Sequence, residues 1–186
     1  MRQRGFGMVE VLITLVIVAV GLLGLAGLHM RAQRAELESY QRVQALILLD
    51  DMAGRLRANR DAARCYEITT DDPTTQFIGA DKDPGSCAGW GAAVTRDRAD
   101  DDLSEWDDLL EGAAETRGGT NVGAMTGARG CIDYDGTGTN DRYTITVVWQ
   151  GETPTTAPAS NCAQGNYGDP DLRRAVSQTV TLPTLP

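Results

Sequence analysis

An uncharged apolar run near the N-terminus constrains this chain more than any other feature. Residues 11–28 carry no charge, and the wider run 6–28 carries only the charge of Glu10. As a helix, its 23 residues would extend about 34 Å, enough to cross the roughly 30 Å hydrocarbon core of a bilayer. No small-residue cleavage site follows the run, which leads directly into a helical pattern. The sequence therefore predicts a helix over 6–28 that contacts membrane lipid.

Charge divides the chain after this run. Residues 31–64 contain seven arginines and five acids, whereas residues 65–186 contain 8 Lys+Arg and 20 Asp+Glu. Two arginines in residues 1–5 favour a cytoplasmic N-terminus under the positive-inside rule, which places the acidic part across the membrane. Arg31 and Arg34 on the other flank of the run weaken this bias.

Composition argues against several functional classes. A formal net charge of −9 lacks the electrostatic attraction that nucleic-acid binding requires, so no nucleic-acid partner is expected. The single histidine, His29, argues against a histidine-based metal site and against a Ser-His-Asp triad. We expect no cofactor, no metal and no enzymatic activity.

The segment after the apolar run has a helical pattern. No proline occurs before residue 73, so one continuous helix from Phe6 to about Asn59, roughly 80 Å long, is expected. Its second half carries an apolar stripe at helical spacing that should pack on the acidic part of the chain. The stripe comprises Ala45, Leu48, Leu49, Met52, Ala53 and Leu56.

The acidic part, residues 65–186, is predicted to form strands, loops and one short helix. Residues 143–150 alternate with period two, placing Tyr143, Ile145, Val147 and Trp149 on one face, and residues 131–134 should pair with them as a hairpin. Residues 172–182 predict another strand, with Leu172, Val176, Val180 and Leu182 on one face. A helix is expected over 103–112, with Asp102 and Glu105 as a capping box and Leu103, Trp106 and Leu110 buried. The prediction is an α+β fold.

Four cysteines follow the apolar run, and none belongs to a C-x-x-C pair, which disfavours zinc or thioredoxin-type chemistry. An even number in a translocated, loop-rich domain favours two disulfides. Three pairings are possible. Local closure favours the sequential one, Cys65 with Cys87 and Cys131 with Cys162.

Two acidic segments could be ligand sites or ordinary structural elements. Residues 133–141 resemble a calcium loop superficially, but the glycine and the final acid of an EF-hand are misplaced, and a hairpin turn explains the same residues. Residues 97–108 are interpreted as a solvated helix face.

The N-terminus resembles the prepilin signature of type IV pilins. Residues 4–15 read RGFGMVEVLITL, with a basic leader, glycine, phenylalanine, and glutamate five residues into the mature chain. The resemblance implies that a prepilin peptidase removes residues 1–5, cutting between Gly5 and Phe6, and that Phe6 is N-methylated. The new amine gives Glu10, which is costly to bury unpaired in hydrocarbon, a partner in a neighbouring subunit. Glu10 would then set the register of assembly.

Three further segments resemble PilV-type minor pilins: DDMAGRLRAN at 50–59, RYTITVVWQG at 142–151 and RRAVS at 173–177. This implies a type IV pilin-like fold, in which the long N-terminal helix packs on a small antiparallel sheet. Residues 6–28 would form the transmembrane and filament-core helix, 29–64 its amphipathic continuation and 65–186 a periplasmic, disulfide-bonded head. Residues 71–129 match no segment we can name.

The function implied is that of a minor pilin, a structural subunit that helps to prime and cap type IV pilus fibres at the bacterial inner membrane. Its expected partners are the prepilin peptidase, other minor pilins, the major pilin and the inner-membrane assembly platform, and it would enter the extracellular pilus. Alternatives are a minor pseudopilin of a type II secretion system and a pilus-tip adhesin. For an adhesin, Trp90 and Trp106 could stack on a sugar, although both are expected to pack in the core.

Overall fold

The computed structural model divides into two compact units, residues 1–39 and residues 40–186, which are described separately. The predicted cleavage pair Gly5 and Phe6, and residues 137–139 of the candidate calcium turn, lie outside the described residues. The described residues are 7–68, 76–80, 82, 84–113, 116–121, 125–136 and 140–183.

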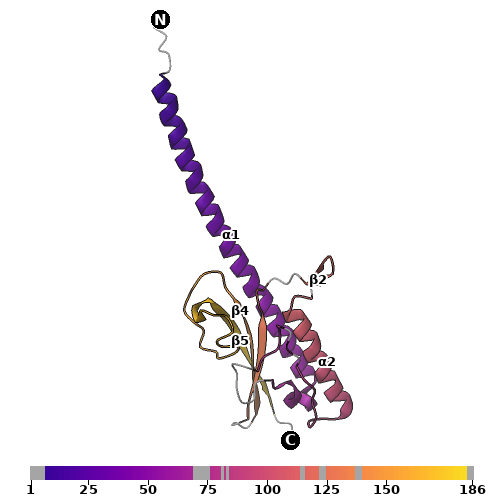
Figure 1. Ribbon diagram of the computed structural model, residues 1–186. Helices are drawn as coiled ribbons and strands as arrows, with labels where there is room; N and C mark the ends of the chain where they lie inside the picture. The colour runs from indigo at the N-terminus through magenta and orange to yellow at the C-terminus, as the bar shows by residue number, and fades with distance from the viewer. Residues whose placement is uncertain are drawn as a thin grey trace. The chain divides into compact units, whose positions relative to one another are not determined.

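The first unit consists of the N-terminal part of helix α1 (Met8–Ala58). The continuous helix expected from the absence of proline is confirmed from Met8 onward (Figure 1). Within this unit nearly every described side chain is exposed, including large apolar ones such as Met8, Ile17 and Leu23.

The second unit contains the rest of α1, and here the predicted apolar stripe is buried. Its six members are at most 8% exposed and belong to the main hydrophobic core. Helix α2 (Ala93–Leu110) lies beside this part of α1 (Figure 1), and the Trp106 indole Nε1 donates a hydrogen bond to the Leu48 carbonyl at 2.9 Å. A short 3₁₀ segment, η1 (Arg60–Tyr66), follows α1 and contributes Ala62, Ala63 and Tyr66 to the same core.

The sheet of the second unit has three antiparallel strands in the order β3-β4-β5. They are β3 (Arg129–Asp135), β4 (Asp141–Gln150) and β5 (Arg173–Leu182). The predicted hairpin is confirmed: Tyr134 of β3 lies opposite Tyr143 of β4. The predicted face of β4 is also correct, because Tyr143, Ile145, Val147 and Trp149 are all buried in the main core. The sequence did not predict a separate small hairpin in which β1 (Thr116–Arg117) pairs with β2 (Thr120–Asn121), each strand having two residues.

The last strand begins one residue later than expected. Leu172 lies in the 3₁₀ segment η2 (Pro170–Leu172), where the Asp169 side chain accepts a hydrogen bond from the Asp171 backbone N–H. The prediction that Leu172 shares the strand face was therefore wrong, because this cap turns the chain before β5 starts.

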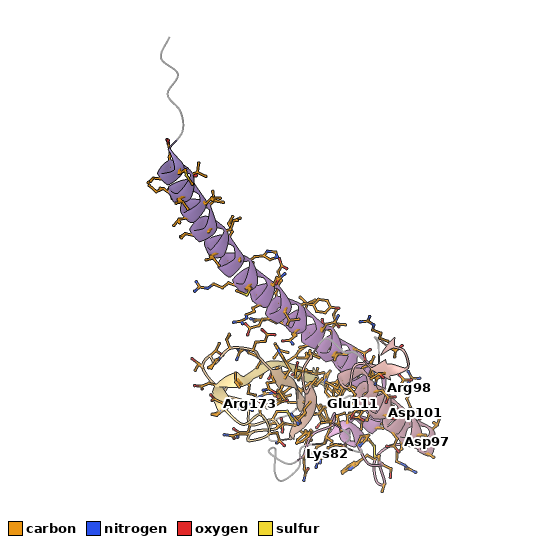
Figure 2. The ribbon with its side chains drawn as sticks, turned by 45° about the horizontal axis from the view of Figure 1, so that its top comes forward. Lys82, Asp97, Arg98, Asp101, Glu111 and Arg173 are labelled. Carbon is orange, nitrogen blue, oxygen red and sulfur yellow. A yellow bond between two sulfur atoms is a disulfide. The ribbon has the colours of Figure 1, made fainter. Side chains whose placement is uncertain are left out.

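The opposite face of the sheet is covered as well. Val148 and Cys131 pack there with Phe77, Ala163 and Tyr167 in a second, smaller core. Arg173, which is 3% exposed, donates hydrogen bonds to the carbonyl oxygens of Cys162 and Pro158. The loop from residue 151 to 169 is thus anchored to the start of β5, near the Arg173 label in Figure 2.

Helix α2 is ten residues longer at its N-terminal end than predicted, since it starts at Ala93 rather than at residue 103. Leu103, Trp106 and Leu110 are buried as expected. The capping box was wrong: Asp102 lies in the middle of α2, is 5% exposed and makes tertiary contacts. Asp97, Arg98 and Asp101 lie on the outer side of α2 (Figure 2) and are exposed, as expected for a solvated face.

Candidate functional site

The first unit presents an apolar helix surface with one acid at its beginning. Glu10 lies in the first turn of α1, where its backbone N–H donates to the Gly7 carbonyl at 3.0 Å. Its side chain is exposed. The apolar side chains that follow are exposed as well, for example Leu12 at 61% and Ile17 at 65%. An apolar surface of this size is unfavourable in water and indicates contact with lipid or with another protein chain.

By length and composition, α1 is the one described helix that is apolar enough to cross a membrane. The helix continues through the apolar run into the polar region without interruption as far as Ala58.

A network of polar groups centred on Arg55 and the buried Asp102 joins α1 to α2. The Arg55 guanidinium donates to Asp51 at 2.7 Å, to Asp102 at 3.0 Å and to Glu105 at 2.6 Å. Burial works to lower the pKa of Arg55, but the hydrogen bonds to Glu105, Asp51 and Asp102 outweigh it and raise the pKa above its usual range. Arg55 thus stays charged and fixes α2 on α1.

The same aspartate receives a second donor from η1. The Tyr66 hydroxyl donates to Asp102 and accepts a hydrogen bond from the Asn59 side-chain amide at 3.1 Å. Burial, and then the hydrogen bond to Asp102, raise the pKa of Tyr66, so the phenol remains a donor. The charged Arg55 guanidinium and the neutral Tyr66 hydroxyl together satisfy a carboxylate that would otherwise be costly to bury.

Two disulfides hold the loops of the second unit. They join Cys65 to Cys87 and Cys131 to Cys162, which are the sequential pairs. The first ties η1 to the segment before α2, and the second ties β3 to the loop after β4.

Two further expectations concern ligands. Among the described residues, no three acidic, cysteine or histidine side chains gather in a group that could hold a metal ion. Trp106 packs in the core as expected, but Trp90 does not: it is 54% exposed. The Cys65–Cys87 disulfide ties the segment before Trp90 to η1, and Gly91 directly after it adopts a positive φ of 73°, so this short loop turns at the surface.

Comparison with known families gives two adjoining matches. Residues 1–26 match the prokaryotic N-terminal methylation motif, and residues 27–104 match the Tt1218-like family, described as type IV pilin Tt1218. Together they run without a gap over more than half of the 186 residues. The chain is a type IV pilin. No curated protein and no solved structure matches it.

Membership of this family explains the long N-terminal helix and the small antiparallel sheet, and it makes the protein a pilin subunit. The methylation motif implies processing by a prepilin peptidase and assembly with other pilins. The Tt1218-like match also extends to residue 104, into the region 71–129 where the sequence offered no resemblance.

Sequence reasoning identified Glu10 but missed the polar network of the pilin head. Arg55 was noted only as part of a resemblance, and Asp102 was assigned to a cap. The residue type of Asp102 does not distinguish it from the other acids of α2. Its position on the same side of the helix as the buried Ala99, Leu103 and Trp106 is the sequence signal that could have indicated its burial.

Proposed function

We propose that this type IV pilin is a minor pilin of the PilV type, which helps to prime and cap pilus fibres at the bacterial inner membrane. The observation that carries the proposal is an exposed apolar helix, headed by Glu10, most of which lies within the methylation motif matched over residues 1–26. The minor role is supported by the resemblance of residues 50–59 and 142–151 to PilV-type pilins.

The proposal gives each part of the chain a task. The leader 1–5 is removed between Gly5 and Phe6, and Phe6 becomes N-methylated. Residues 6–28 anchor the subunit in the membrane and later enter the filament core, while the segment 29–64 continues α1 as far as Ala58 and then enters η1. Residues 65–186 form the head in the periplasm, an oxidising compartment that suits two disulfides.

In this proposal, Glu10 sets the stagger between neighbouring pilin helices. The amine of Phe6 in a neighbouring pilin is a cation at the start of the same apolar segment, and Glu10 is the only charge within residues 6–28. A carboxylate left unpaired in hydrocarbon costs a few kcal/mol, so a wrongly staggered neighbour is penalised more than the correct pair gains. The partners are other minor pilins and the major pilin, brought together at the inner-membrane assembly platform.

Mass spectrometry of the membrane form tests the processing step. The expected species begins at Phe6 with one methyl group on its amine. A chain that keeps its leader, or that starts at another residue, would refute both the cleavage and the role of Glu10.

The register role is tested by Glu10→Ala, with Glu36→Ala as the matched control. Both glutamates are exposed on α1, but Glu36 lies outside the apolar run. We expect Glu10→Ala to lower the amount of this pilin in sheared fibres about tenfold or more. Without the carboxylate, a wrongly staggered subunit no longer carries the penalty of a few kcal/mol that favours the correct register. Glu36→Ala should leave incorporation unchanged. Equal incorporation of the two variants would contradict the proposal.

The resemblance of the N-terminal region is shared by minor pseudopilins of type II secretion, which are the second candidate. Deletion of the gene separates the two. Loss of twitching motility with intact secretion of exoproteins supports the pilus, and the reverse result supports secretion. A tip adhesin is a further candidate, favoured by the exposure of Trp90.

A further inference from the structure

A groove in the second unit, residues 40–186, is lined by side chains to which the proposed assembly role assigns no task. Its volume is about 390 Å³, within the roughly 300–1,000 Å³ typical of small-molecule sites. All of its described lining lies within the second unit, in η1, in the loop before α2 and at the adjoining ends of β3 and β4. Its lining includes Arg60, Asp61, Arg64, Trp90, Asp141 and Tyr143.

Trp90 is the exception among the three tryptophans of the head. Trp106 and Trp149 are at most 3% exposed, whereas Trp90 is 54% exposed. Its position is nevertheless defined, because the Arg64 guanidinium lies over its ring at 5.2 Å and over the Tyr134 ring at 3.6 Å. Cation–π contacts of this kind hold an aromatic ring in place. Trp90 therefore offers a fixed flat apolar surface to solvent.

A buried hydroxyl in the lining lacks a partner. Tyr143 is 0% exposed, and its hydroxyl forms no hydrogen bond among the described residues. By contrast, the hydroxyl of neighbouring Tyr134 donates to Asp141 at 2.6 Å. Burial raises the pKa of Tyr143, so its hydroxyl keeps the proton and can donate. A buried polar group is normally hydrogen-bonded, and an unpaired one that lines a groove is available to a ligand.

The charges of the lining indicate what kind of ligand fits. Arg60 and Arg64 balance Asp61 and Asp141, so the groove has no net charge to attract an anion or a cation. Arg64 is also paired with Glu67 at 2.9 Å. Planar guanidinium and carboxylate groups beside an aromatic face suit a ligand with apolar C–H faces and many hydroxyl groups.

We propose that this groove binds a neutral saccharide, whose ring stacks on Trp90 and whose hydroxyls hydrogen-bond to Asp61, Arg64 and the Tyr143 hydroxyl. This site goes beyond the assembly function proposed above and does not depend on it. It would give the assembled pilus, or the periplasmic form of the subunit, affinity for a carbohydrate.

The test uses the full-length chain in dodecyldimethylamine oxide, a detergent without a sugar headgroup. Its probes are immobilised neutral oligosaccharides of hexoses and N-acetylhexosamines, with sialylated oligosaccharides as charged counterparts. We expect binding to at least one neutral oligosaccharide. Titration with that saccharide in solution should shift the emission of Trp90 to shorter wavelength, since the other two tryptophans are already buried.

Three variants decide whether the groove is responsible. Trp90→Ala should weaken binding at least about tenfold, as for an aromatic anchor. Tyr143→Phe should weaken it about three- to tenfold, the effect of one hydrogen bond, without lowering Tm, because the hydroxyl has no hydrogen-bond partner among the residues that the structure describes. Tyr40→Ala removes an aromatic residue that is 45% exposed outside the groove and should change nothing.

The proposal is overturned if no neutral oligosaccharide binds, if sialylated ones bind more tightly, or if Trp90→Ala and Tyr40→Ala bind alike. It is also overturned if the groove instead captures the head of another pilin in a Trp90-dependent way. The result is separate from that of the assembly experiments. Trp90→Ala should enter fibres at the wild-type level, and Glu10→Ala should bind saccharide as the wild type does.

Discussion

Replacing Arg55 by methionine tests the packing of α2 on α1 in the pilin head. Methionine keeps most of the aliphatic length but removes three hydrogen-bonded contacts, to Asp51, Asp102 and Glu105. The decisive loss is at Asp102, whose side chain is 8% exposed and cannot recover full hydration when its closest cation is gone; the Arg98 guanidinium, 67% exposed and 3.9 Å away, replaces it only weakly.

The expected cost follows from the exposure of each partner. Removing one member of a fully buried ion pair costs about 3–5 kcal/mol. The Arg55 side chain is 20% exposed, and Asp102 keeps the hydrogen bond from the Tyr66 hydroxyl, so the penalty should be smaller. We therefore expect a loss of roughly 2–3 kcal/mol in the free energy of unfolding, or about 4–12 °C in Tm. The contacts to the more exposed Asp51 and Glu105 should add little.

Urea unfolding followed by tryptophan fluorescence measures this loss, because Trp106 and Trp149 are buried in the head. Arg57→Met is the matched control: Arg57 is exposed on the same helix, and its replacement should cost less than about 0.5 kcal/mol. In an Asp102→Asn background, Arg55→Met should cost at least about 1 kcal/mol less than in the wild type. If Arg55→Met is no more costly than Arg57→Met, or if Asp102→Asn leaves its cost unchanged, the buried-charge argument is wrong.

Three other predictions concern the head. Gly130→Ala should lower stability by about 1–3 kcal/mol in thermal unfolding, because an added Cβ would clash with the Trp106 ring; no loss would mean that this contact is looser than described. Burial raises the pKa of Asp133, so the folded state binds more protons there than the unfolded state and stability falls as pH rises from the unfolded pKa through the folded one. Asp133→Asn should therefore unfold at a higher urea concentration than the wild type at pH 7 but not below about pH 3.5, and the opposite pH trend would contradict the assignment. Non-reducing peptide mapping should recover Cys65 linked to Cys87, and a peptide linking Cys87 to Cys131 would refute the pairing.

The sequence was most informative where one physical requirement acts along a continuous stretch. The absence of proline and the apolar stripe predicted α1 and its buried face, because both depend on helical spacing alone. Period-two alternation likewise predicted which face of β4 is buried. The prepilin signature gave the family because its residues are adjacent in the chain.

Local patterns failed where distant segments supply the decisive contact. Asp102 had the spacing of a helix cap, yet Arg55, 47 positions earlier, and Tyr66 bury it in the middle of α2. Trp90 was expected in the core because tryptophan is a large aromatic residue. The turn at Gly91 and the stacking of Arg64 instead hold it at the surface.

The sequence by itself determined that this chain has a long apolar helix with a single acid near its start, because hydropathy and helical period need no knowledge of contacts. Only the tertiary structure decided which polar groups of the head are paired. Hydrogen bonds and ion pairs between distant segments depend on where the chain returns, as the partnered Asp102 and the unpartnered hydroxyl of Tyr143 both illustrate.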